Sequence, residues 1–147
     1  MIPPAAGFSL AADEGEPLEF SGARFLVRAS AATTGGAFTI IEEIDPLDTP
    51  LHVHEREDEL FYVLEGEHIF VVGDEEHRVG PGGVVFGPRN VPHAHSRAVA
   101  RTGRFLTMTS PAGFEGFFRE LAGAAARGGA GAEDYARVSR AYGVAWL

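Results

Sequence analysis

The stretch HVHEREDELFYVLEG, residues 52–66, carries the strongest pattern in this 147-residue chain. It places two histidines one residue apart, follows them with an acidic run and ends in an apolar segment. Side chains at positions i and i+2 of a strand point to the same face, about 7 Å apart along the backbone. His52 and His54 can therefore face one metal ion together, because bonds of about 2.0–2.1 Å to a metal lie within reach of both imidazoles.

Glu59 begins the apolar part of this stretch. In a strand it shares a face with Phe61 and Val63. A carboxylate on an apolar face is costly to bury unless its charge is neutralised, and a bound cation would neutralise it. We therefore expect Glu59 to join the two histidines in a metal site. The other acids of the stretch are expected in a solvated loop: Glu55, Glu57 and Asp58.

A second histidine pair lies in GPRNVPHAHS, residues 87–96. His93 and His95 share one strand face after a turn bounded by prolines. Three or four imidazoles and one carboxylate from two distant segments suit Fe, Mn, Ni, Cu or Zn. A lone buried histidine is more often a hydrogen-bonded core residue, so His95 by itself carries less weight. His68 and His77 flank the turn GDEE and are expected at the surface.

The composition excludes several kinds of chemistry. The sequence has no cysteine, and its twelve basic residues are all arginine, which excludes thiolate ligands, thiol nucleophiles and lysine Schiff bases. The formal net charge of −9 argues against a nucleic-acid binder. No apolar run approaches the roughly 20 residues that span a bilayer, and the start MIPPAAGFSL lacks the basic region of a signal peptide. We expect a soluble, cytoplasmic protein with a single domain, residues 1–147.

Short apolar runs separated by turns fill residues 8–109. Each run has the length of a strand and is rich in β-branched or aromatic residues. The runs are FTIIEEI (38–44), ELFYVLEG (59–66), HIFVVG (68–73), GGVVFGP (82–88) and RFLTMT (104–109). Glycine, proline and aspartate separate them, as is typical of turns. This spacing, with no long helical pattern between the runs, predicts an all-β sandwich or small barrel.

The pattern changes to that of helices after residue 109. Ser110 is the predicted N-cap and Pro111 a residue of the first turn. The apolar residues that follow have the spacing of one helix face: Phe114, Phe117, Phe118 and Leu121. A hinge of small residues, 123–134, precedes a second short helix that ends at Gly143. We expect both helices to cover the outside of the β-region or to form a dimer contact.

Two motifs in this order resemble those of the cupins. The first cupin motif, H-x-H-x(3,4)-E-x(6)-G, is filled by His52, His54, Glu59 and Gly66. The second, roughly G-x(5)-P-x(4)-H, is similar to Gly82, Pro88 and His93. The resemblance covers residues 35–108, and it departs from the family at Pro46 and at Gly82-Gly83, positions outside the expected ligands.

The resemblance implies a double-stranded β-helix, the cupin jelly-roll barrel, over about residues 20–109, with a short C-terminal helical tail over about 111–143. It implies one divalent metal ion, Fe, Ni, Mn, Cu or Zn, in the mouth of the barrel. The implied ligands are His52, His54, Glu59 and His93. His95 is implied as an acid/base group lining the pocket or as a support for the ligands. The cavity walls are expected from Phe61, Val63, Phe70 and Phe86.

Among cupins, the wording EDELFYVLEGE…VFGPRNVPHA is most similar to small bacterial members related to quercetin 2,3-dioxygenases. This resemblance implies a metal-dependent dioxygenase acting on a small aromatic or flavonol-like substrate, with Glu59 and His95 as catalytic residues. Glu59 would both bind the metal and take the substrate proton, which requires an intermediate pKa.

Two alternatives remain open. One is a non-oxidative polyketide cyclase or isomerase that uses the metal as a Lewis acid, and the other is a cupin that binds a small molecule without turnover. In each case the partner is a small molecule, with no nucleic acid and no membrane. A homodimer is also expected, with residues 18–30 supplying a strand at the contact.

Overall fold

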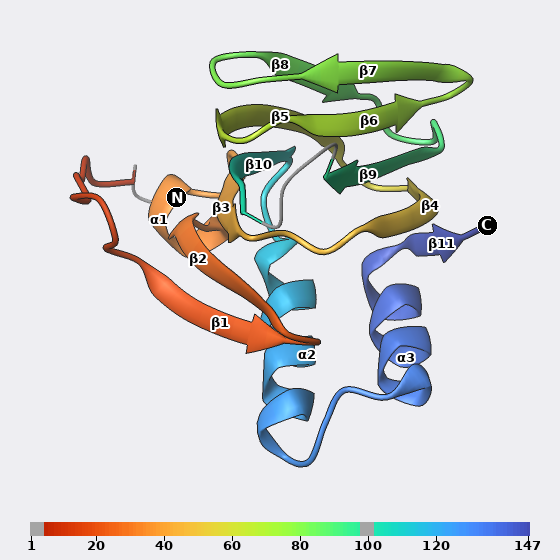
Figure 1. Cartoon of the computed structure of the whole chain (residues 1–147). Coiled ribbons are helices and arrows are strands. Elements are labelled where there is room, and N and C mark those ends of the chain that lie inside the picture. The colour runs from red at the N-terminus through yellow and green to blue at the C-terminus, as the bar shows by residue number, and fades with distance from the viewer. Residues whose placement is uncertain (1–4, 98–101) are drawn as a thin grey trace.

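Two β-sheets of antiparallel strands face each other in the computed structural model, which describes residues 5–97 and 102–147 (Figure 1). The larger sheet has the order β1 (Glu16–Phe20), β2 (Ala23–Ala29), β3 (Thr39–Ile44), β10 (Arg104–Ser110), β5 (Asp58–Glu65), β8 (Val84–Gly87). The smaller sheet has the order β11 (Val144–Trp146), β4 (Thr49–His54), β9 (His93–Arg97), β6 (His68–Val72), β7 (Glu75–Val79). The chain passes from one sheet to the other between β3 and β4 and again between β4 and β5, which gives a jelly roll.

Alternation along β5 places the apolar side chains between the sheets. Glu59, Phe61 and Val63 are 4%, 2% and 0% exposed, whereas Tyr62 between them is 42% exposed. Phe61 and Val63 pack with residues of both sheets in one buried cluster: Phe70, Val85 and Phe105. The predicted all-β class and the inward face of this strand are confirmed.

Two predictions about the sides of strands are wrong. Phe86 was expected in the cavity wall but is 55% exposed, because the register of β8 turns Val85 inward instead. His68 was expected at the surface but is 1% exposed, since it shares the inward face of β6 with Phe70. The His68 Nε2–H group donates a hydrogen bond of 2.9 Å to the Glu65 carbonyl oxygen, which satisfies the buried ring. His77 is only partly buried, and its side chain is 41% exposed.

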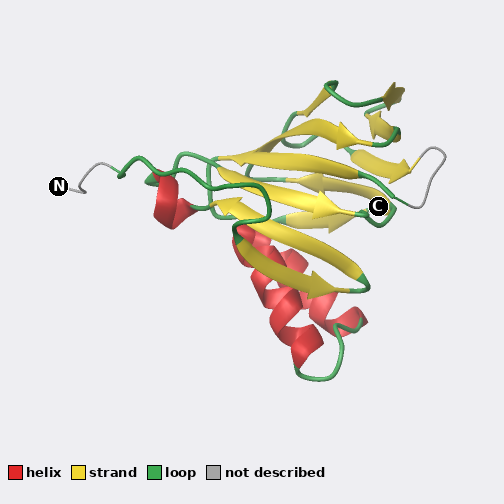
Figure 2. Ribbon diagram, turned by 60° about the vertical axis from the view of Figure 1, so that its left-hand side comes forward, coloured by secondary structure: helices red, strands yellow, loops and turns green. Residues whose placement is uncertain are grey.

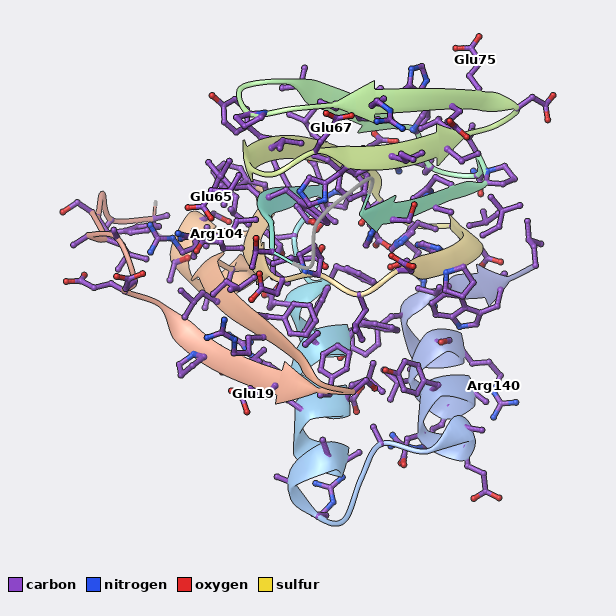
Figure 3. All side chains as sticks on the ribbon, viewed as in Figure 1. Glu19, Glu65, Glu67, Glu75, Arg104 and Arg140 are labelled. Carbon is purple, nitrogen blue, oxygen red and sulfur yellow. The ribbon has the colours of Figure 1, made fainter. Side chains whose placement is uncertain are left out.

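Arginine partners the buried carboxylate of Glu42 in the larger sheet. Arg104 forms ion pairs with Glu42 at 2.5 Å and with Glu65 at 3.6 Å. Arg104 and Glu65 lie beside each other in the stick view (Figure 3). This pairing compensates the burial of Glu42, which is 4% exposed.

The helices are α1 (Ala31–Thr34), α2 (Glu115–Ala126) and α3 (Ala132–Tyr142). The predicted N-cap at Ser110 is wrong, because Ser110 still pairs with Asp58 as the last residue of β10, and the first residue of α2 is Glu115. The predicted hinge is also shorter than expected, since alanines 124–126 continue α2. The second helix ends as predicted, with Gly143 at a left-handed φ of 70°.

Figure 2 shows α2 and α3 together on one side of the sheets. The apolar face of α2 packs against the hairpin of β1 and β2, and a second buried cluster forms there: Phe20, Phe25, Ile41, Phe114, Phe117, Phe118, Leu121, Val138 and Val144. None of the described helices is long and apolar enough to cross a membrane.

The N-terminal residues predicted at a dimer contact, 18–30, form most of the β1–β2 hairpin. Strand β2 of the hairpin also pairs with β3, and β1 is the edge strand of the larger sheet. The homodimer stays a prediction.

Candidate metal centre

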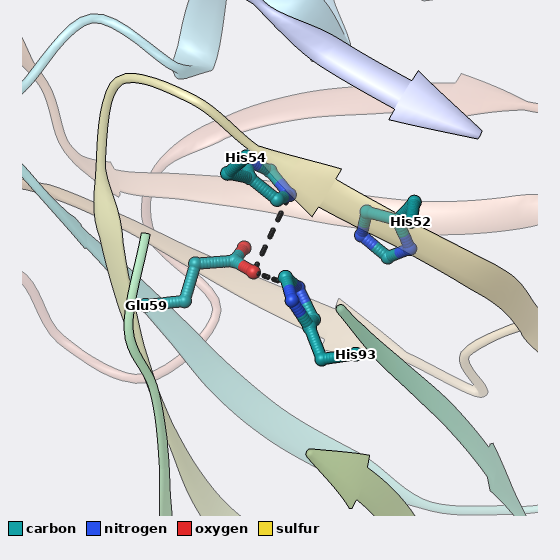
Figure 4. Close-up of side chains that lie close together, drawn as sticks. All are labelled: His52, His54, Glu59 and His93. Atoms are coloured by element: carbon teal, nitrogen blue, oxygen red, sulfur yellow. Dashed lines mark ion pairs between the residues drawn. The ribbon is translucent and has the colours of Figure 1, made fainter. Parts of the chain in front are cut away.

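Four side chains from both sheets meet at one end of the space between the sheets. His52 and His54 come from β4, His93 from β9 and Glu59 from β5, and Figure 4 shows them converging. The pairing of β4 with β9 brings two of the histidines together, because His52 and His93 are directly paired residues of these strands. One ligand atom from each residue lies within 4.8 Å of the others. All four residues are buried, at 2–6% exposure.

Hydrogen bonds fix the orientation of the three imidazoles. The Nδ1–H groups donate to the Pro50 carbonyl at 2.7 Å, to Glu57 Oε1 at 2.7 Å and to the Val91 carbonyl at 3.3 Å. The donors are His52, His54 and His93, in that order. With the proton held on Nδ1, each ring presents the Nε2 lone pair, which is the form of histidine that binds a metal ion.

Two buried atoms at the centre have no hydrogen-bond partner among the described residues: Glu59 Oε2 and His93 Nε2. These two atoms contact each other, and His54 Nε2 lies 3.4 Å from the same carboxylate oxygen. Buried polar atoms without a partner are costly. A cation between a carboxylate and imidazole lone pairs would satisfy them, so the donor set fits a divalent metal ion.

The electrostatics favour an ionised Glu59 carboxylate and shift the pKa values of His52 and His54 in opposite directions. Burial acts to raise the pKa of Glu59, but the imidazoles of His54 and His93 outweigh burial and lower that pKa to about 2. Burial and the charge of His93 lower the pKa of His52 to about 4. Burial also acts to lower the pKa of His54, but the carboxylates of Glu59 and Glu57 outweigh burial and raise it above its ordinary value.

His95 lies beside this group without belonging to it. Its Nε2 forms a hydrogen bond of 2.9 Å with Thr49 Oγ1, and its ring packs edge-on against Phe61 and Phe105. Burial, and then the charge of His52, lowers the pKa of His95 to about 3. His95 is therefore a neutral group of the cavity wall, and its predicted role in catalysis stays a prediction.

A cavity of about 200 Å³ opens beside the four residues. Eight of the described residues that line it carry a phenyl, phenol or indole ring: Phe20, Phe25, Phe61, Phe114, Phe117, Phe118, Tyr135 and Trp146. Its polar groups include Asp48, Thr49 and Glu43. Among the described residues that line it, none is an arginine. The cavity therefore combines an aromatic surface with a few polar groups.

The C-terminal residues form part of this wall, which corrects the expectation that the helices cover only the outside. Strand β11 pairs with β4 and places the Trp146 ring 5.0 Å from that of His52. The Phe114 ring, just before α2, lies edge-on at 4.6 Å from that of His54. No local pattern of the sequence showed these contacts, because they depend on the pairing of the C-terminal strand β11 with β4, which carries His52 and His54.

Sequence reasoning also missed two carboxylates of the site. Glu57 was expected in solvent, yet it is 6% exposed and accepts the hydrogen bond from His54. Glu43 is 7% exposed and lines the cavity. The sequence pattern that could have shown the burial of Glu43 is the alternation in FTIIEEI. It places Glu43 on the same face as Thr39 and Ile41, both 1% exposed.

The family described as "Cupin domain" matches residues 41–109. The Bacillus subtilis (strain 168) protein named quercetin 2,3-dioxygenase is 28% identical over 119 residues, or 80% of this chain. The chain spans only 35% of the length of that relative.

Solved structures share the fold. An RmlC-like cupin from Shewanella frigidimarina NCIMB 400 has a TM-score of 0.60 at 20% identity, over 74% of this chain and 93% of its own. Residues 41–109 therefore form a cupin domain. KdgF from a Halomonas species has a TM-score of 0.64 at 18% identity, over 75% of this cupin and 98% of its own chain. At these identities the structures show that the fold is shared, and the double-stranded β-helix predicted from the two motifs is confirmed.

Proposed function

We propose that this cupin is a metal-dependent enzyme that oxidises a small phenolic or flavonol-like substrate with dioxygen. The observation that carries the proposal is the buried group of three imidazoles and one carboxylate that faces an aromatic cavity. The Bacillus relative named quercetin 2,3-dioxygenase supports the same chemistry.

The residues that would hold the ion are His52, His54, Glu59 and His93. A divalent ion bound there supplies Lewis acidity to a substrate oxygen and, if it is Fe, Ni, Mn or Cu, a route for electrons to dioxygen. The Nδ1 hydrogen bonds of the three histidines would orient the ligands. Glu59 would add one negative charge to the ligand set. The predicted second role of Glu59, as the base for the substrate proton, is tested by Glu59→Gln.

The aromatic wall would bind and orient the substrate. Planar rings favour offset or edge-to-face contacts with Phe and Trp, and such contacts exclude water from the reacting atoms. Phe61 forms one side of the wall from the larger sheet, and Trp146 lies near His52 from the smaller sheet. His95 and Thr49 add a polar pair for a hydroxyl or carbonyl group of the substrate.

Elemental analysis of the purified protein beside the His52→Ala/His54→Ala double variant is the first test. About one equivalent of a divalent metal in the wild type, lost in the variant, supports the site. Dioxygen consumption with quercetin by the metal-loaded protein, absent in the double variant, supports the oxidative function. A protein that retains no metal after reconstitution with any of the five ions contradicts the proposal.

The alternatives separate in the same assays. Turnover of a polyketide or enol substrate without dioxygen would identify a cyclase or isomerase, and bound zinc would direct the search there. Tight binding of flavonols with no turnover under either condition would identify a binding protein.

A further inference from the structure

Glu43 is a buried carboxyl group in the cavity that the metal ligand set does not use. It lies on β3, two strands away from β5, which carries Glu59. The cavity that it lines is the one onto which His52, His54 and Glu59 also open. A molecule bound in this cavity would therefore meet Glu43 and the predicted ligands on different parts of the wall.

The neighbours of Glu43 in the sheet carry no positive charge. Its paired neighbours in the sheet are Phe25 on β2 and Phe105 on β10, both apolar. Its hydrogen-bond partner is Thr107, whose hydroxyl donates to Oε2 at 2.5 Å. A carboxyl group with one hydroxyl partner between two phenyl rings gains little by being ionised, because burial disfavours the charged form.

The other titratable groups that share the cavity are few: Asp48, His52, His54, Glu59, His95 and Tyr135. Burial is the largest influence on Glu43 and raises its pKa to about 7; Thr107 opposes this rise, and the charge of Glu59 adds to it. A group with a pKa near the working pH can both accept and return a proton.

We propose that Glu43 is a catalytic residue that accepts the proton of the substrate hydroxyl group in this cavity. In this step the substrate O–H bond breaks and the proton forms a new O–H bond with the Glu43 carboxylate. The electron pair stays on the substrate oxygen, which leaves an anion of the phenolate or enolate class for the ligand site. The Thr107 hydroxyl orients the carboxyl group through its hydrogen bond to Oε2.

The proposal rests on the proposed function, and it assigns to Glu43 the proton that the sequence alone would give to Glu59. The Oε2 atom of Glu59 forms ion pairs with His54 and His93. Glu43 has no such contact with the ligand set, so it can change its protonation state without loss of a metal ligand.

Proton counting on binding of catechol tests the proposal without any need for turnover. Catechol is titrated into the metal-loaded protein under nitrogen, and the binding enthalpy is measured in buffers of different ionisation enthalpy. The slope gives the protons released. At about pH 8 the free Glu43 is largely ionised, so the wild type should keep the catechol proton, and Glu43→Gln should release about one proton more. At a pH low enough for the free Glu43 to be protonated already, the two proteins should release the same number.

Glu42→Gln is the matched control, because Glu42 is the next residue of the same strand and pairs with Arg104 on the other face. Its proton count should equal that of the wild type. Thr107→Val keeps the Glu43 carboxyl group but removes the hydrogen bond that lowers its pKa, so the pH range of proton uptake should shift upward. Metal content and melting temperature are measured for every variant.

The outcomes separate the two proposals. Equal proton release by wild type and Glu43→Gln at about pH 8 overturns the role of Glu43 and leaves the phenol site standing. Failure of the metal-loaded wild type to bind catechol overturns the proposed function for phenolic substrates, and the role of Glu43 with it.

Discussion

His54 Nδ1 lies 2.7 Å from Glu57 Oε1, three residues further along the chain. Both side chains are buried, so this bond orients a predicted ligand from outside the ligand set. Carboxylates in this position raise the basicity of a ligating imidazole, and their removal typically weakens metal binding by about 10–100-fold.

Glu57→Ala should therefore weaken the affinity for the divalent ion by roughly tenfold or more. Competition with a chromophoric chelator measures the affinity. Glu55→Ala is the control, because Glu55 belongs to the same acidic run but is exposed. Equal affinities of the two variants would show that the bond to Glu57 does not support the site.

Glu43→Gln should stabilise the metal-free protein above neutral pH. The pKa of Glu43 is about 7 in the folded chain against an ordinary 4.5, so the folded state binds more protons than the unfolded state between these values. Wild-type stability must then fall as the pH rises from about 4.5 to 7, and a neutral glutamine avoids this loss.

At about pH 8 the gain should be about 1–3 kcal/mol, since one pKa unit corresponds to about 1.4 kcal/mol. Urea denaturation at about pH 8 and at about pH 4.5 measures the difference, which should disappear at the lower pH. Glu42→Gln should instead destabilise the protein, because it breaks the ion pair with Arg104. A gain for Glu43→Gln that is the same at both pH values would refute the raised pKa.

Trp146 should contribute to substrate binding without being needed for the metal. Its ring lies 5.0 Å from that of His52, and its Nε1–H donates a hydrogen bond of 2.8 Å to Ser139 Oγ, which fixes the ring at the cavity. Trp146→Ala should weaken catechol binding by roughly five- to tenfold, because an aromatic contact is worth about 1 kcal/mol beyond burial.

Calorimetry on metal-loaded protein measures this effect, and elemental analysis checks that the metal stays bound. Leu147→Ala is the matched control, because Leu147 is the next residue but is 70% exposed. If Trp146→Ala binds catechol as the wild type does, the C-terminal strand takes no part in the pocket.

The convergence of His52, His54 and Glu59 could be predicted from the sequence because its information is local. In HVHEREDELF the two-residue period of a strand places His52 and His54 on one face and Glu59 on an apolar face. The structure brings these residues together with His93, and the inward face of β5 follows the same period.

The rest of the site depends on which segments meet in space. Trp146 reaches His52 because β11 pairs with β4, and the two strands lie about 90 residues apart in sequence. Phe86 was placed on the wrong face because GGVVFGP offers apolar residues on both faces of the strand, so alternation alone could not choose between them. Glu57 was misplaced because composition predicts solvated acids and gives no sign of a partner such as His54.

Leu121 should stabilise the C-terminal cover of the cavity. It is 0% exposed and belongs to the cluster that joins α2 to the β1–β2 hairpin. Leu121→Ala should cost about 2–5 kcal/mol of unfolding free energy, because the lost burial adds to the cost of the cavity that remains. Phe86→Ala is the contrasting variant and removes a larger side chain that is 55% exposed, so it should cost far less. Urea denaturation compares the two, and a greater loss for Phe86→Ala would mean that Phe86 packs inside after all.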